Sequence, residues 1–220
     1  MSYEQYNNVV EFHRTFGHPV ETERCPEKIK DVKLIKLRID LIEEEIIETE
    51  KAIINNDLHE IIDGLCDIQY VTLGAQIVLG VEFSPIRIQG IKTLRDGLNE
   101  LKLAAGNFNF QGFVLSLMII QKAIDCLVMK HGLTGIFDQA FEEVHNSNMT
   151  KVCDSEQQAL SDKEYRELEG INVIIEKIGK YWVLKNKDTL KVVKAVNWRE
   201  PNFENLIKLI QYDDSTDEDY

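Results

Sequence analysis

The chain has 220 residues, a formal net charge of −13, and ordinary shares of hydrophobic (44%) and charged (29%) residues. This length is enough for one sizeable hydrophobic core. The excess of negative charge disfavours nucleic acid and acidic membranes as partners, the polar N-terminus does not look like a signal peptide, and no apolar run is expected to be long enough to span a bilayer.

Hydrophobic periodicity and the placement of Gly, Pro and Asn predict a mainly helical chain. The predicted helices cover residues 3–16, 30–55, 57–80, 85–105, 111–130 and 134–145, with a weaker one at 161–177. Residues 181–193 are predicted to form a β-hairpin with its turn at 186–188, and a short apolar stretch, 203–210, follows Pro201. The expected fold class is therefore all-α, a helical bundle with a small C-terminal β-hairpin.

Two further features concern the chain end and the cysteines. Residues 212–220 are rich in Asp and Glu and have no apolar pattern, so this tail is predicted to be disordered. The four cysteines are scattered without a Cys-x-x-Cys pair. We interpret them as reduced thiols in a cytoplasmic protein.

A first cluster of carboxylates lies in the helix predicted at 30–55. At 100° per residue, Glu44, Glu45 and Glu48 share the apolar face of this helix, whereas Glu43 and Glu50 fall on the far side and are expected to face solvent.

A second cluster repeats this pattern in the next helix. Glu60, Asp63 and Asp67 lie within about 60° of one another. A short Asn-Asn-Asp turn joins the two helices, so an antiparallel pair would bring both clusters together. Gly64 and Gly74 would allow close approach on that side.

Carboxylates on an apolar face with few cations beside them are typical of a metal site, because buried like charges are otherwise costly. Mg²⁺ prefers oxygen ligands, and Mn²⁺ can take its place. Metal ions of this kind can bridge carboxylates to the phosphates of a nucleotide and lower the pKa of an attacking water. A carboxylate not fully engaged with metal could orient that water. Asp67 is a metal ligand, a partner of a ligand, or a helix hydrogen-bonding group.

The motif EExxE (Glu44, Glu45, Glu48), a short turn and ExxD (Glu60, Asp63) resembles the signature of the all-α nucleotide pyrophosphohydrolases. That superfamily includes MazG-like proteins, dimeric dUTPases and phosphoribosyl-ATP pyrophosphohydrolases. The sequence is most similar to the phosphoribosyl-ATP pyrophosphohydrolase-like branch. Three stretches carry the resemblance: VVEFHRTFG, LIEEEIIETEKAIINNDLHEIIDGLCDIQYVTLGAQIVLGV and FDQAFEEVHNSNMTKV.

The resemblance implies Mg²⁺-dependent cleavage of a nucleoside triphosphate between its α and β phosphates, and assembly as a homodimer. The implied catalytic residues are Glu44, Glu45 and Glu48. The implied metal ligands are these three with Glu60, Asp63 and Asp67. The implied substrate-binding residues are Asn148 and Lys151, with Asn146, Lys194 and Tyr70 as weaker candidates; Tyr70 could stack on a base or be an ordinary buried tyrosine.

The chain also departs from the family pattern. We expect a single domain, 1–211, with an inserted helical hairpin at 81–133 and a C-terminal extension at 155–211. The insertion could cover the nucleotide pocket, change the assembly or decorate the bundle. Either this hairpin or a second subunit is expected to close the acid-lined site.

Three alternatives remain open. The first is hydrolysis of phosphoribosyl-ATP in histidine biosynthesis, which is the same reaction on another substrate. The second is a di-iron bundle, disfavoured because neither acidic cluster contains the Glu-x-x-His pair of those proteins. The third is a helical nucleotide-binding scaffold without turnover.

Overall fold

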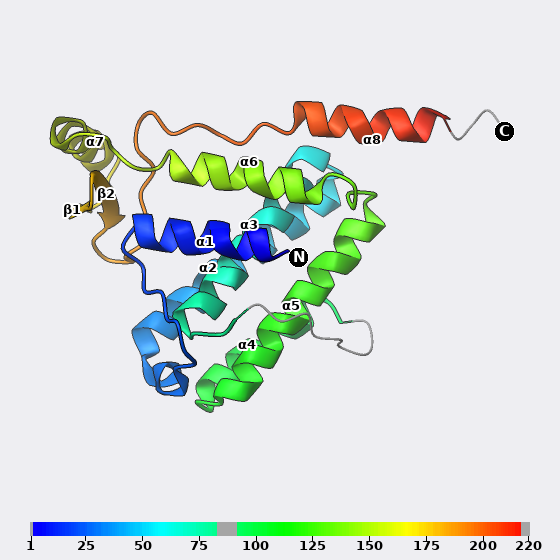
Figure 1. Cartoon of the computed structure of the whole chain (residues 1–220), viewed down its shortest axis with the longest axis horizontal. Helices are drawn as coiled ribbons and strands as arrows, with labels where there is room; N and C mark the ends of the chain where they lie inside the picture. Colours follow the sequence, from blue (N-terminus) through cyan, green and yellow to red (C-terminus); the bar gives the residue numbers. More distant parts are fainter. Residues whose placement is uncertain (1, 83–91, 217–220) are drawn as a thin grey trace.

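The computed structural model describes residues 2–82 and 92–216 and is predominantly helical (Figure 1). Its elements are α1 (Tyr3–Thr15), the short 3₁₀ helix η1 (Pro26–Lys30), α2 (Val32–Asn55), α3 (Leu58–Val78), α4 (Leu94–Gly106), α5 (Phe110–Lys130), α6 (Phe137–Met149), α7 (Glu156–Leu168), β1 (Val173–Ile178), β2 (Tyr181–Asn186) and α8 (Glu204–Thr216). Helices α1 to α6 share one large core, and the described strands form a two-stranded antiparallel sheet. The predicted all-α fold class is confirmed.

Helices α2 and α3 form the predicted antiparallel hairpin. Asn56 ends α2 in the left-handed conformation (φ 52°), and the Asp57 side chain begins α3 by accepting a hydrogen bond from the backbone N–H of Glu60. A Cβ at Gly64 would lie 2.3 Å from the Thr49 hydroxyl oxygen of α2. The glycine therefore permits the close helix approach that the sequence predicts.

Helices α4 and α5 form a second hairpin, which packs α4 on α2 and α5 on α3. Helix α4 begins after a capping box between Thr93 and Asp96, later than the start predicted at residue 85. Residues 85–91 of that prediction lie outside the described residues. Within the core, the Gln76 side chain of α3 donates to that of Gln121 of α5 at 3.2 Å.

Helix α5 corrects the expectation that no run is long enough to span a bilayer. Phe110–Lys130 has an 18-residue window with a mean hydropathy of 1.8, so by length and composition alone it could cross a membrane. Of that window, 61% is buried inside the protein, and α5 packs against α3 and α4. Burial in the bundle accounts for the apolar character of this helix.

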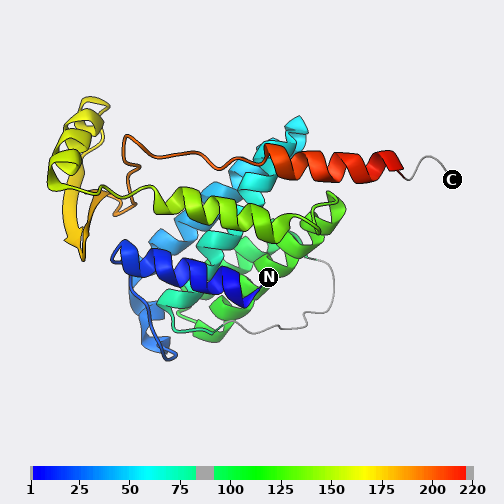
Figure 2. The same ribbon diagram turned by 45° about the horizontal axis from the view of Figure 1, so that its top comes forward.

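Helices α1 and α6 lie side by side and both contact α3 (Figures 1 and 2). The Gln5 side chain of α1 donates to Asp138 of α6 at 2.9 Å. Helix α6 runs to Met149, beyond the end predicted at residue 145. The Asn-Ser-Asn-Met segment therefore forms the last turn of a helix rather than an irregular loop, which fixes the directions of its side chains.

The region after α6 differs from the prediction of a helix at 161–177. Helix α7 starts earlier and ends at Leu168, and Val173–Ile178 is strand β1. Gly170, with φ 85°, breaks the helix, and the β-branched residues of the following segment suit a strand. The predicted helix at 161–177 therefore joined the end of α7 to most of strand β1.

The hairpin of β1 and β2 turns at Gly179 (φ 58°), not at 186–188. The predicted turn is also present: the Asn186 side chain accepts hydrogen bonds from the backbone N–H groups of Asp188 and Thr189, both at 2.9 Å. The residues after it return beside β2 but contribute only an isolated bridge, Lys185 with Val192. The prediction was therefore wrong about the strand that pairs with β2, which is β1 and not the segment after residue 188.

Helix α7 and the two strands pack around a small core of their own and project to one side of the bundle (Figure 2). Cys153 is buried in that core, and all four cysteines are free thiols. From here the chain runs back alongside α6 to α8 (Figures 1 and 2).

Helix α8 extends beyond the apolar stretch 203–210 to Thr216, so the predicted disorder of the acidic tail is wrong for 212–216. Residues 217–220 lie outside the described residues. Buried Phe203 anchors the start of this helix, and Asn202 accepts a hydrogen bond from the Glu204 N–H. Once a helix has been nucleated in this way, propagation by further residues costs little.

Candidate functional site

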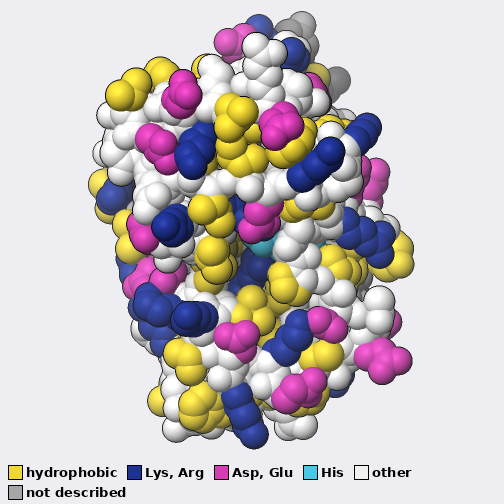
Figure 3. All heavy atoms as spheres, turned by 90° about the vertical axis from the view of Figure 1, so that its left-hand side faces the viewer, with side chains coloured by type: hydrophobic (Ala, Val, Ile, Leu, Met, Phe, Trp, Pro, Cys, Tyr) yellow, Lys and Arg dark blue, Asp and Glu magenta, His cyan; other side chains and the backbone are white. Residues whose placement is uncertain are grey.

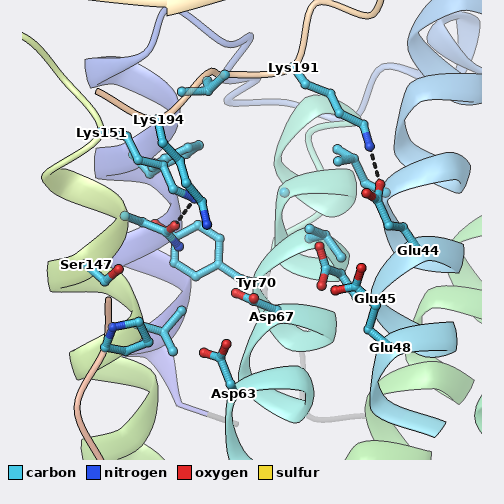
Figure 4. Close-up of a pocket in the computed structure, with 18 of the residues that line it drawn as sticks. Glu44, Glu45, Glu48, Asp63, Asp67, Tyr70, Ser147, Lys151, Lys191 and Lys194 are labelled. Carbon is cyan, nitrogen blue, oxygen red and sulfur yellow. Dashed lines mark hydrogen bonds and ion pairs between the residues drawn. The ribbon is translucent and has the colours of Figure 1, made fainter. Parts of the chain in front are cut away.

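A cavity of about 560 Å³ lies between α1, α2, α3, α6 and residues 190–201 (Figure 4). The side of the molecule drawn in Figure 3 is hollowed near its centre, with histidine and basic side chains at the bottom of the hollow. Among the described residues, none from α4 or α5 lines the cavity. The hairpin of α4 and α5 therefore does not line the cavity, and α1, α6 and residues 190–201 form its walls together with α2 and α3.

Both predicted acidic clusters open into this cavity. Glu44, Glu45 and Glu48 project from α2 on one side, and Asp63 and Asp67 project from α3 at its centre (Figure 4). The remaining predicted acid, Glu60, also lines the cavity near its exposed edge, 3.5 Å from the His59 ring.

Burial and crowding disfavour full ionisation of the inner carboxylates. Desolvation, with the nearby Asp67, Glu48 and Glu44, raises the pKa of Glu45 to about 8. Desolvation, with Asp63 as the main neighbouring charge, raises the pKa of Asp67 to about 7. Desolvation and Glu60 raise the pKa of Asp63 to about 6. These carboxyl groups therefore share a site with too little positive charge.

The chemistry of these side chains fits a hard divalent cation. Glu45, Glu48, Asp63 and Asp67 supply carboxylate oxygens that accept no hydrogen bond from the described residues. Within residues 2–82 and 92–216, no three His, Cys, Asp or Glu side chains come close enough to one another to hold a metal ion. The predicted ligands therefore line one cavity, but their carboxylates stay too far apart to share a metal ion, as expected of like charges that repel.

Positive charge lies on the opposite side of the cavity (Figure 4). Lys151, just after α6, donates a hydrogen bond to Asn148, and burial lowers the pKa of this lysine. Lys194 lies close to Lys151, with its ammonium 3.5 Å from the centre of the Trp198 ring. The predicted residues Asn148, Lys151 and Lys194 therefore all face the predicted acids.

The two other predicted substrate-binding residues differ. Tyr70 lines the cavity, but its ring packs edge-on against Phe12 and stacks on Phe141, and its hydroxyl lies 3.0 Å from His145 Nδ1. This favours a wall of the cavity over a free stacking surface. Asn146 is exposed and does not line the cavity, because a position two residues before Asn148 points to the other side of α6.

The prediction missed several polar residues of the cavity, among them Arg38, His13, His18 and Lys191. Arg38 lies within about 20° of Glu45 on the helical wheel of α2, so the same arithmetic could have found it. His13 and His18, from α1 and the loop after it, had no comparable signal. Neither had Lys191, which forms an ion pair with Glu44 from 147 positions away in the sequence (Figure 4).

Comparison with known proteins places this site in a family. Residues 9–89 match the model of the phosphoribosyl-ATP pyrophosphohydrolase family, a segment that contains both acidic clusters but neither Lys151 nor Lys194. The chain is 30% identical over 240 aligned positions to the uncharacterized protein L479 of Acanthamoeba polyphaga mimivirus, with 92% of this chain and 95% of the viral protein covered. No solved structure matches the chain.

The matched segment contains the second half of α1 and all of α2 and α3, and the six predicted acids within it line the cavity together. The all-helical fold, the acidic motif and the family match agree. Residues 9–89 of the chain belong to the phosphoribosyl-ATP pyrophosphohydrolase family of the MazG-like, all-α nucleotide pyrophosphohydrolase superfamily.

Proposed function

We propose that this pyrophosphohydrolase-like protein cleaves a nucleoside or deoxynucleoside triphosphate between its α and β phosphates, releasing the monophosphate and pyrophosphate. The observation that carries the proposal is the division of one cavity into an acidic and a basic side, with Glu45, Glu48, Asp63 and Asp67 opposite Lys151 and Lys194. A triphosphate is the kind of ligand that needs both sides.

On the acidic side, carboxylates cannot bind phosphate directly. Glu44, Glu45, Glu48, Glu60, Asp63 and Asp67 are the residues that would hold Mg²⁺, or Mn²⁺ in its place. When bound, such ions neutralise phosphate charge and lower the pKa of a nearby water. Among the same acids, one of Glu44, Glu45 and Glu48 that is not fully engaged with metal would orient the attacking water by accepting its hydrogen bond.

On the basic side, the two lysines would hold the anionic substrate. Lys151 is already oriented by Asn148, and a lysine ammonium is a compact charge that suits phosphate oxygens. Because Lys151 and Lys194 face the acids across the cavity, they would place the phosphate chain between the two walls.

Phosphoribosyl-ATP is the second candidate substrate, because the family whose model matches residues 9–89 is named for it. The acids alone do not separate it from ordinary triphosphates, because the bond that is cleaved is of the same type. The third reading, a scaffold without turnover, is opposed by the complete set of cavity-lining acids.

The homodimer expected from the resemblance stays a prediction. Support for a site within one chain comes from α1, α6 and residues 190–201, which line the cavity together with the acidic helices α2 and α3. We therefore propose that each chain carries a complete site. Sedimentation velocity over a range of protein concentrations tests the dimer independently of activity.

The test of the function is pyrophosphate release, with Mg²⁺ or Mn²⁺, from a panel of nucleoside triphosphates, deoxynucleoside triphosphates and phosphoribosyl-ATP. Release that needs the metal and is lost in Glu48→Gln supports hydrolysis and identifies the substrate. Activity on phosphoribosyl-ATP alone selects the second candidate. No release from any compound, with folded protein and either metal, contradicts the proposal and favours the scaffold.

A further inference from the structure

One end of the cavity contains a buried arginine without a partner. The Arg38 side chain lines the cavity, yet the residue is only 4% exposed. Its Nε is fully buried without a hydrogen-bond acceptor, and no described residue forms an ion pair with its guanidinium. Burial alone lowers the pKa of Arg38 to about 10, so the group stays charged at neutral pH.

An unpaired buried guanidinium is costly to a folded protein. It carries five N–H donors in a fixed plane and no acceptor. Such a group is explained if a ligand that presents hydrogen-bond acceptors completes it. The position of Arg38 inside the cavity makes the substrate the natural source of those acceptors.

His13 supplies an acceptor next to this donor group. Its Nδ1 lies 2.9 Å from the Pro19 carbonyl oxygen, which can only accept, so Nδ1 carries the proton and Nε2 presents a lone pair. Burial, together with the Arg38 charge, lowers the pKa of His13 to about 3, so the ring is neutral at pH 7.

Gly74 of α3 brings the two groups to one place. A Cβ on this glycine would lie 2.9 Å from His13 Nε2 and 3.3 Å from an Arg38 Nη atom. A side chain at this position would collide with His13 and crowd Arg38, so the glycine lets both groups pack against α3 at the same point.

The surrounding surface suits a flat ring. Phe12 and His18 line this end of the cavity and stack on one another, with ring centres 5.9 Å apart and an angle of 22° between their planes. Desolvation and Arg38 lower the pKa of His18 to about 2, so this ring is also neutral. Phe12 also stacks on Phe16, so these rings, like that of Tyr70, form a wall of the cavity against which the edge of a nucleobase can pack.

The spacing along α2 matches the two ends of a nucleotide. Arg38 and Glu48 are separated by about 15 Å of helix axis at 1.5 Å per residue. The acids and lysines at one end are where the phosphates are proposed to bind, which leaves the base for the other end. An anionic group on Arg38 would also face the lone pair of His13 Nε2, because the proton of His13 is on Nδ1, which donates to the Pro19 carbonyl oxygen.

We propose that Arg38 and His13 select the nucleobase, presenting two donors and one acceptor to bases that offer two neighbouring acceptors followed by a donor. Guanine has this order along N7, O6 and N1–H, and cytosine has it along O2, N3 and the exocyclic amine. Adenine and uracil or thymine alternate acceptor, donor and acceptor. The inference rests on the proposed function for the identity of the ligand as a nucleotide, and adds which bases it takes.

The test is calorimetric binding of GMP, CMP, AMP and UMP, which needs no turnover. We expect wild-type protein to bind GMP or CMP at least about 10-fold more tightly than AMP and UMP, the discrimination typical of one good bidentate contact. Arg38→Gln should reduce this preference to within about threefold. Lys36→Gln, an exposed position on the same helix that pairs with Asp40, is the matched control and should leave the preference unchanged.

Equal binding of all four bases by wild type, or a preference for AMP or UMP, would overturn the proposal. So would an equal loss for all four in Arg38→Gln, which would mark a contact to phosphate or ribose. Should Arg38→Gln fail to fold, Arg38→Met removes the buried charge and keeps the volume, and the same outcomes apply to it.

Pyrophosphate release from the four triphosphates separates this proposal from the proposed function. Base-selective binding without any release would contradict hydrolysis and support base selection by Arg38 and His13. Release with equal kcat/KM for all four bases would support hydrolysis and contradict base selection.

Discussion

Glutamates lie on two sides of α2, and their surroundings differ: those on one side are paired with cations, and those on the other side face the cavity. Glu43 and Glu50 form ion pairs with Lys102 and Arg95 of α4. Glu45 and Glu48, on the other side, face a cavity in which other carboxylates are their nearest charges. The sequence predicted that Glu43 and Glu50 would face solvent; both lie at the surface, and each also forms an ion pair with a cation of α4.

The comparison teaches what separates a structural carboxylate from a functional one. Each acid of the paired side has a cation beside it at the surface, an arrangement worth little energy and involving no strain. Of the acids in the cavity, Glu45, Asp63 and Asp67 have raised pKa values because they are desolvated and crowded. Such a cluster is retained against its cost where a cation or substrate completes it.

The largest expected effect comes from removing charge on the cavity side. Glu48→Gln and Asp63→Asn should each lower pyrophosphate release by more than about 100-fold, since losing a metal ligand exceeds the loss typical of the residues that support one. Thermal unfolding should stay the same or rise, because repulsion between like charges is relieved. Steady-state kinetics and calorimetry measure the two effects.

The matched control for that experiment is Glu50→Gln, two residues further along the same helix and on its paired side. Its activity should stay within about twofold of wild type, because its carboxylate faces α4 and not the cavity. A fully active Glu48→Gln, Asp63→Asn double variant would erase the functional difference between the two sides.

The basic wall gives the next effect. Lys151→Gln should raise the KM for a triphosphate by about 10-fold, the loss of one charge-assisted contact of about 1.4 kcal/mol, with a smaller change in kcat. Lys177→Gln, a lysine that lies over the Trp182 ring of β2 rather than in the cavity, serves as the control. An unchanged KM in Lys151→Gln would mean that Lys151, on the side of the cavity opposite the acids, does not bind the substrate.

The third effect concerns pH and the histidine end of the cavity. His13 has a folded pKa of about 3, below its usual value near 6.5, so the unfolded chain binds the proton more readily. The folded state is therefore not penalised by His13 above about pH 6.5, and it loses stability as the pH falls from 6.5 toward 3. At pH 5 this loss is about 2 kcal/mol.

The raised pKa values of the cavity acids act in the opposite direction, so the measurement is a difference between variants. Chemical denaturation of wild type and His13→Gln at pH 7 and pH 5 should show a smaller loss on acidification in the variant. Equal losses in both proteins would mean that His13 is not held neutral by burial.

The smallest effect lies on the paired side. Arg95→Gln and Glu50→Gln should each destabilise the protein by less than about 1 kcal/mol, and the double variant by less than their sum. High salt should reduce both effects. A double-mutant cycle measures the coupling; a coupling well above that range would show that α4 is fastened mainly by this ion pair.

Much of the fold could be predicted because it depends on local pattern. The α2–α3 hairpin, its Asn-Asn-Asp turn and the closeness at Gly64 all follow from signals a few residues apart. The strand β1 was missed because a short apolar segment after a helix suits either structure, and its pairing with β2 is decided by the partner strand.

The candidate site divides in the same way. That Glu44, Glu45 and Glu48 share one helix face, and that Asp63 and Asp67 share another, was determined by the sequence, because a helix repeats every 3.6 residues and needs no knowledge of the rest of the chain. Only the tertiary structure decided what lies opposite each face: α4 beside Glu43 and Glu50, and Lys151, Lys194, His13 and the unpaired Arg38 around the cavity. Those neighbours come from helices and loops far away in the chain, and long-range packing, which local periodicity does not encode, brings them together.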